Sequence, residues 1–298
     1  MNFKFENLNL IKPIPLSENP KLMKHLHEKK AKIVDQFRPK EMDFVDIYPE
    51  SEILADLEEM RKIEENFHNN EEQKYKTELS SLLEAVLADQ IESNNWLGEN
   101  TEVVPASRYD DIKYGVDIVS IYREEDSEEY LGLGVDVAFA NDKRNIISKL
   151  DGIKLLLKNG LIPKLKYFED PSTGEHKELL VPKVVVGTRQ SSAEKLLKTW
   201  GGESADRNKK LANDPMQSKI ILESMYQINY FRNYLNELIK DEKNLNKKNK
   251  YQSIQDAYEK MYVIFSNIYQ EKEEIIKSHI NEISDDIVYE TILEYTKS

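Results

Sequence analysis

Two aspartates stand inside apolar segments where Val or Ile would pack better. The stretch YGVDIVSIYREEDSEEYLGLGVDVAFA, residues 114–140, holds two runs rich in β-branched residues, with Asp117 in the first and Asp136 in the second. Such runs predict β-strands. If they form a hairpin that turns at Asp126–Ser127, residues whose numbers sum to 253 face each other, and Asp117 then faces Asp136. A one-residue slip would put the two side chains on opposite faces of the sheet.

A pair of facing carboxylates needs something to offset its charge. Like charges directly opposite each other destabilise a sheet, and the apolar neighbours of both aspartates would remove much of their water. Either one carboxylate keeps a proton or a cation lies between them. Mg²⁺ and Mn²⁺ prefer carboxylate oxygens, so we favour a site for Mg²⁺ (or Mn²⁺) on Asp117 and Asp136. The alternative is a pair of solvated aspartates on the open face of an amphipathic hairpin.

The surrounding pattern predicts the elements that would position this pair. A helix with one apolar stripe is expected before the strands, and a second helix, ended by Gly160 as a C-terminal cap, is expected after them. Two further strands and a long helical region follow, so the predicted order is α, three strands, α, two strands and a helical tail. The expected ranges are 77–93 and 142–159 for the helices, and 161–169 and 178–188 for the later strands.

This order of elements, together with these acidic residues, resembles the PD-(D/E)XK nuclease-like superfamily from about Thr77 to Thr199. The resemblance implies an α/β fold with a restriction-endonuclease-like core (α-β-β-β-α-β-β, a mixed sheet flanked by helices) and N- and C-terminal helical extensions. Asp117 matches the family's first acidic position and Asp136 the second. Glu84 matches the glutamate of the first helix, with Glu78 as a rival. The implied metal ligands are Asp117, Asp136 and the Val137 carbonyl.

The sequence departs from the family at the lysine of its motif, because GVDVA places Ala138 there. In the family this lysine helps to position or deprotonate the attacking water, and alanine can do neither. Lys143 is the best substitute, because a helical wheel places it on the inward face, whereas Lys149 and Lys154 lie nearer the edges. A snorkelling surface lysine is the other interpretation of Lys143, and a lost lysine could also mean a lost activity.

Composition limits where the protein acts and what it binds. The formal charge of −13 counts against tight nonspecific binding of nucleic acid, although an acidic metal site with a local basic rim is compatible with it. The chain has no cysteine and no apolar run of membrane-spanning length, so we expect a cytoplasmic protein without a membrane partner. We divide it into residues 1–72, an N-terminal arm and helices; 73–200, the nuclease-like core; and 201–298, a C-terminal helical region.

The leading functional hypothesis is a metal-dependent nuclease that hydrolyses DNA phosphodiester bonds, with Asp117, Asp136, Glu84 and Lys143 as its catalytic residues. The C-terminal helices would select the substrate, form a homodimer or join a protein complex. A catalytically inactive protein of the same fold, acting as a binding or assembly module, is the alternative. A purely helical scaffold with an incidental hairpin is a third hypothesis.

Overall fold

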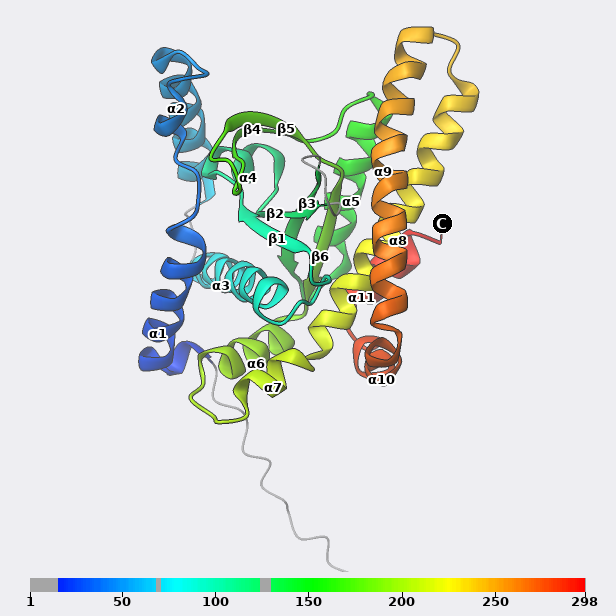
Figure 1. Cartoon of the computed structure of the whole chain (residues 1–298). Coiled ribbons are helices and arrows are strands. Elements are labelled where there is room, and N and C mark those ends of the chain that lie inside the picture. Colours follow the sequence, from blue (N-terminus) through cyan, green and yellow to red (C-terminus); the bar gives the residue numbers. More distant parts are fainter. Residues whose placement is uncertain (1–15, 68–70, 124–129, 298) are drawn as a thin grey trace, which may run out of the picture.

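A four-stranded sheet lies at the centre of the computed structural model, which describes residues 16–67, 71–123 and 130–297 (Figure 1). The strand order is β1-β2-β3-β6. The first three strands are antiparallel neighbours, and β6 lies parallel to β3. A parallel pair requires a crossover connection, and α5 lies within it. The bounds are Thr101–Pro105 for β1, Ile118–Arg123 for β2, Tyr130–Phe139 for β3, Lys143–Lys158 for α5 and Lys183–Thr188 for β6.

The predicted hairpin register is confirmed along the β2–β3 ladder. Ile118 pairs with Val135 and Arg123 with Tyr130, so paired residue numbers sum to 253. The predicted turn at Asp126–Ser127 lies outside the described residues. Within β3 the side chains alternate, and Leu133, Val135 and Val137 contribute to the main hydrophobic core.

A separate two-stranded hairpin, β4 (Lys164–Glu169) and β5 (His176–Leu180), covers part of the sheet. Leu165, Phe168 and Val181 pack there against Val119 and Ile121 of β2 in a second, smaller core. The prediction of one strand over 178–188 is wrong, because this range divides between β5 and β6. Pro182, which has no N–H to donate to a ladder, lies at the break.

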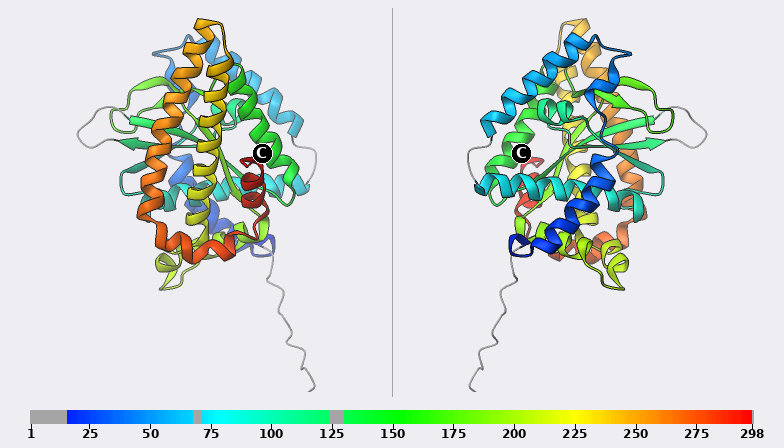
Figure 2. Two further views of the ribbon diagram at one scale, coloured as in Figure 1. Left: turned by 90° about the vertical axis from the view of Figure 1, so that its right-hand side faces the viewer. Right: turned by 90° about the vertical axis from the view of Figure 1, so that its left-hand side faces the viewer.

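The N-terminal helices cover one side of the molecule, as the right-hand view of Figure 2 shows. The helix α3 packs on β1 and β3, and α1 packs on α3. Helix α2 precedes α3, and α3 begins earlier than the predicted residue 77. The bounds are Leu16–Glu18 for η1, Pro20–Lys30 for α1, Ala31–Asp35 for the π-helical turn η2, Glu41–Phe44 for η3, Glu50–Phe67 for α2 and Glu71–Ser93 for α3.

The C-terminal region is helical, as predicted, and its longest helices α8 and α9 stand side by side against the sheet (Figures 1 and 2). The last part of this region contains α9, α10 and α11, and the short α4 and α7 were not predicted. The bounds are Arg108–Tyr114 for α4, Gln190–Gly201 for α6, Arg207–Ala212 for α7, Pro215–Asp241 for α8, Leu245–Glu271 for α9, Glu273–Ile283 for α10 and Ile287–Tyr295 for α11.

Side chains of α8 and α9 occupy the outer edge of β6. Gln227 accepts from the Val185 N–H (2.9 Å) and donates to the Val185 carbonyl (2.6 Å). Glu223 accepts from the Gly187 N–H at 2.9 Å. The Tyr258 hydroxyl lies 3.2 Å from both the N and the O of Lys183. Three side chains thus replace a fifth strand, which satisfies backbone groups that a buried edge would otherwise leave unpaired.

One hydrophobic core joins all three segments that the sequence suggested. It contains Leu26 of α1, Leu83 of α3, Leu150 of α5 and Phe231 of α8, all fully buried. The observed architecture is a mixed α/β fold, with a mixed four-stranded sheet flanked by helices and a helical C-terminal region. In the described part of the chain, no helix is long and apolar enough to cross a bilayer.

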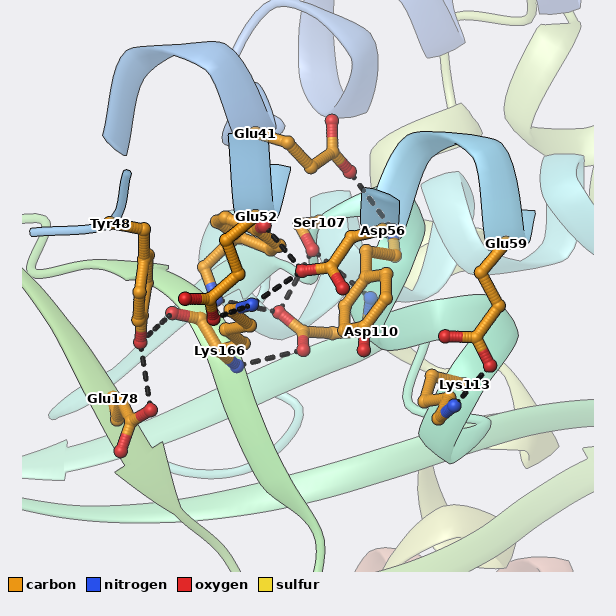
Figure 3. Close-up of polar contacts among 12 residues, drawn as sticks. Glu41, Tyr48, Glu52, Asp56, Glu59, Ser107, Asp110, Lys113, Lys166 and Glu178 are labelled. Carbon is orange, nitrogen blue, oxygen red and sulfur yellow. Dashed lines mark hydrogen bonds and ion pairs between the residues drawn. The ribbon is translucent and has the colours of Figure 1, made fainter. Parts of the chain in front are cut away.

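A charged cluster around Lys166 fastens α2 to β4 (Figure 3). The Lys166 ammonium lies 2.6 Å from Glu52 and 2.5 Å from Asp56, both on α2. Asp110 of α4 is fully buried and accepts from the backbone N–H groups of Lys166 and Tyr167. Burial raises its pKa to about 6, against these hydrogen bonds. The cluster therefore fixes α4 and α2 relative to the sheet.

Because Gln227 pairs with the backbone at the outer edge of β6, we expect Gln227→Met to lower the stability of the protein. Methionine has nearly the same length but cannot pair with the Val185 N–H or carbonyl, and each buried group left unpaired costs about 1–3 kcal/mol. We expect the free energy of unfolding in urea to fall by roughly 2–4 kcal/mol. Gln252→Met, at an exposed position of α9, should change it little. Equal stability of the two variants would contradict the sealing role of Gln227.

Candidate functional site

Asp117 and Asp136 lie next to each other at one end of the β2–β3 hairpin, and both are buried. Asp136 is within β3, whereas Asp117 directly precedes β2. The Asp117 N–H donates to the Val135 carbonyl (3.0 Å), the residue already paired with Ile118, so the chain leaves the regular ladder here. The Asp117 carboxylate accepts from the Val137 N–H at 2.6 Å. The side chain is therefore held against β3 beside Asp136.

Asp136 lies between two lysines from different elements. Lys149 of α5 approaches one carboxylate oxygen to 2.6 Å, and Lys183 at the start of β6 approaches the other to 2.9 Å. Lys183 also donates to the Tyr114 carbonyl at 2.8 Å. Burial disfavours ionisation of Asp136, but the two ammonium groups outweigh it and hold its pKa below the usual value. Asp136 is therefore ionised at neutral pH.

Gly115 leaves the space that this arrangement needs. Its φ is +61°, a left-handed conformation that favours glycine. A Cβ at this position would lie 2.8 Å from the Lys183 Nζ and 3.2 Å from an Asp136 carboxylate oxygen. The glycine therefore allows both the turn after α4 and the contact between Lys183 and Asp136.

Two further carboxylates and an arginine complete the cluster. Glu84 of α3 and Asp111 of α4 each lie 3.7 Å from the guanidinium of Arg38. Burial raises the pKa of Asp111, although the nearby Arg38 guanidinium opposes this shift. Burial, together with Glu84, Asp111 and Asp136, raises the pKa of Asp117 well above its usual value. Burial and Asp111 raise the pKa of Glu84 to about 7.

These groups open into one hollow of about 630 Å³. It lies between α2, α3 and α4, the segment around η2 and η3, and the ends of the strands. Its wall combines carboxylates at the base with cations around them. The charged residues that line it are Asp35, Glu41, Glu64, Glu84, Asp111, Asp117 and Asp136, with Lys30, Arg38, Lys40, Arg108 and Lys149. A group that entered this hollow would meet both carboxylates and ammonium groups.

The hollow brings together most of the residues that the sequence singled out. Asp117, Asp136, Glu84 and Val137 all line it. The Val137 carbonyl accepts from the Ser80 hydroxyl at 3.3 Å. The rival Glu78 lies instead 2.6 Å from His27.

Lys143 is not brought to the hollow, so its predicted place needs correction. Its ammonium lies 2.8 Å from Glu294 and 3.4 Å from Glu290, both on α11. The inward face of α5 carries Ile146, Leu150, Ile153 and Leu157, and Ile147 is 38% exposed. The predicted inward face of α5 was therefore wrong, because it was rotated relative to the face that is buried. Lys149, three residues after Ile146 and four before Ile153, reaches Asp136 instead.

Sequence reasoning missed three members of the cluster. Asp111 lies on α4, whose seven residues RYDDIKY are too few to show a helical period. Lys183 begins β6 and looks in sequence like an ordinary strand-end lysine. Arg38 comes from a segment distant in sequence, and nothing near it indicates a partner. The N-cap Ser107, which accepts from the Asp110 N–H, was the available signal for α4.

The donor set suits a hard divalent cation, but the carboxylates are not arranged as a closed ligand shell. Among the residues described, no group of three or more His, Cys, Asp or Glu is placed to hold a metal ion. Lys149, Lys183 and Arg38 lie instead against the carboxylates. The pKa values of Asp111 and Asp117 are nevertheless both raised, so negative charge is in excess there, and a cation bound beside them would favour loss of a proton.

Comparison of the chain with protein-family models, with curated proteins and with solved structures finds no match. The functional assignment therefore depends on the geometry of the cluster and of the elements that carry it.

The raised pKa of Glu84 predicts a pH-dependent stability. Between its ordinary value of 4.5 and about 7 the folded protein holds a proton that the unfolded chain releases, so stability falls as pH rises through this range. Glu84→Gln removes the titrating group. Relative to wild type, we expect this variant to gain on the order of 3 kcal/mol from pH 4.5 to above pH 7.

Urea unfolding at several pH values measures this gain, with Glu237→Gln at an exposed position of α8 as the control. The control should follow the wild-type pH dependence. A Glu84→Gln curve parallel to that of wild type would show that Glu84 titrates normally in the folded protein.

Proposed function

We propose that this protein is a metal-dependent nuclease that hydrolyses phosphodiester bonds of DNA, as a divergent member of the PD-(D/E)XK superfamily. One observation carries the proposal. One aspartate just before β2 and one within β3, a glutamate from the preceding helix and a lysine from the crossing helix line one hollow. These four residues come from separate segments of the sequence, so it is the fold that brings them together.

The order of the elements supports a restriction-endonuclease-like core. Helix α3 carries Glu84, the antiparallel strands β1, β2 and β3 follow, α5 crosses, and β6 pairs parallel to β3. The resemblance implies this order with two strands of the sheet after the crossing helix, whereas only β6 joins the sheet there, and α4 lies between β1 and β2. The β4–β5 hairpin is an insertion between α5 and β6 in this comparison.

Asp117 and Asp136 would hold the metal, with Glu84 and the Val137 carbonyl on its remaining sides. A bound Mg²⁺ or Mn²⁺ would neutralise phosphate charge and lower the pKa of an attacking water. The carboxylates in turn would fix the geometry of the ion. A bound cation would favour the ionised form of Asp117, whose pKa is raised.

Lys149 would take the role of the lysine that Ala138 replaces. Its ammonium reaches the same Asp136 carboxylate and faces the hollow. There it can donate to an attacking water or to a phosphate oxygen. Lys183 would be a positioning residue, because it holds the other Asp136 oxygen from a buried place on β6.

A second candidate, an inactive protein of the same fold that serves as a binding or assembly module, is favoured by one observation. Both oxygens of Asp136 already contact ammonium groups, which compete with a metal ion for the same lone pairs. If the lysines win this competition, the hollow binds no metal and cleaves nothing.

Cleavage of DNA by matched lysine variants tests the proposal. Plasmid and single-stranded DNA are incubated with the protein in Mg²⁺ and in Mn²⁺. We expect Lys149→Ala, which removes a proton donor, and Asp117→Asn, which removes a metal-binding carboxylate, each to lower the cleavage rate at least roughly a hundredfold. Lys143→Ala, on the same helix but paired with α11, should cleave like wild type.

Two results would contradict the proposal. If wild type and Asp117→Asn are equally inert on every substrate in both metals, the second candidate replaces the nuclease. If Lys143→Ala loses as much activity as Lys149→Ala, the role given to Lys149 fails.

A further inference from the structure

A basic surface lies on α6, α7 and the loop between them, in a chain of net charge −13. The segment 191–212 carries five basic residues, Lys195, Lys198, Arg207, Lys209 and Lys210, against three acidic ones, Glu194, Glu203 and Asp206. Its local charge of +2 is opposite in sign to that of the whole chain. Such a reversal concentrates positive potential where an anion can approach.

The folded chain gathers these cations around a hollow of about 560 Å³, which we call the α6–α7 cleft. Four cations line it, Lys195, Lys198, Arg207 and Lys210, but only one acid, Glu194. The rest of the wall consists of small residues: Ser191, Thr199, Gly202 and Ser204. The net charge of the residues that line the cleft is therefore +3, which is more positive than the net charge of the segment that forms it.

The lysines of the cleft can reach a ligand. Lys195 pairs with Glu282 and Lys210 with Asp206, each at 3.1 Å. All four side chains in these pairs are more than half exposed, and ion pairs of this kind contribute little. A phosphate group could therefore replace either acid as the partner. Arg207 is half-buried and donates to the Gly202 carbonyl at 3.4 Å, which fixes its place.

The cleft lies beside the helix that carries Glu84. Glu194 of α6 accepts from the Tyr75 hydroxyl of α3 at 3.3 Å, and Trp200 of α6 donates to Asp89 of α3 at 2.6 Å, so α6 packs against α3. Figure 1 shows α6 and α7 below α3. Thr77, Ser80 and Glu84 of the same helix line the candidate site. A polymer that entered the site could continue past α3 onto this cleft.

We propose that the α6–α7 cleft binds the sugar–phosphate backbone of the nucleic acid whose scissile phosphate enters the candidate site. The inference deepens the proposed function and rests on it. The cleft is lined by lysine and arginine side chains and by no aromatic ring. Such a lining suits contacts with the phosphate backbone, which position a nucleic acid without reading its bases. The cleft offsets the repulsion that the net charge of the protein imposes.

Charge reversal at two exposed lysines tests the cleft. Binding of a fluorescent short DNA duplex is followed by anisotropy in EDTA, so that no cleavage occurs. We expect Lys195→Glu/Lys210→Glu to weaken binding roughly tenfold or more, and the slope of log K against log salt to become shallower by about 2, the loss of two phosphate contacts.

The matched control is Lys247→Glu/Lys277→Glu, which changes the net charge equally. Lys247 of α9 is partly exposed and Lys277 of α10 is exposed, and each is paired with an acid. It should bind DNA within about twofold of wild type, since repulsion from distant charges is screened. If both double variants weaken DNA binding equally, or if neither weakens it, the proposed role of the cleft is wrong. It is also wrong if the wild-type protein binds anionic lipid vesicles but not the duplex.

The outcome separates this inference from the nuclease. If the cleft variant binds poorly but wild type cleaves nothing in Mg²⁺ or Mn²⁺, the cleft stands and the proposed function fails. If wild type cleaves DNA and the cleft variant binds it as well as wild type does, only the cleft fails.

Discussion

The rest of the structure depends on one cluster of four carboxyl groups, of which those of Asp117, Asp136 and Glu84 are buried and that of Asp111 is partly exposed. Asp117, Asp136, Glu84 and Asp111 would repel one another in a medium that screens charge poorly. They are tolerated because Lys149, Lys183 and Arg38 approach them from α5, β6 and the segment before η3. The elements around the hollow thus supply both the carboxylates and the cations that neutralise them, and the fold brings these groups close together.

The C-terminal helices contribute no charge to this cluster, but they fix the strand that carries one of its lysines. Tyr258 of α9 contacts the backbone N and O of Lys183, and Gln227 of α8 contacts Val185 two residues later. Sealing the edge of β6 therefore fixes the lysine that holds Asp136. A region that looked in sequence like a separate helical tail is a support of the candidate site.

The sequence predicted what depends on local pattern. The alternation of β2 and β3 gave the register, and with it the meeting of Asp117 and Asp136, because a slip would have moved apolar side chains out of the core. It failed where the answer depends on tertiary contacts. The helical wheel favoured Lys143 over Lys149, and only the packing of α5 on the sheet and on α11 shows that Lys149 reaches Asp136.

The central claim is that these carboxylates form a cation site whose lysines yield to the ion. The most direct test is a crystal grown with Mn²⁺, measured for anomalous scattering at the manganese edge. We expect one strong peak between the Asp117 and Asp136 carboxylates, with the Lys149 ammonium displaced from the oxygen it now contacts. Ordered carboxylates with no peak between them, and Lys149 and Lys183 still bound to Asp136, would contradict the claim.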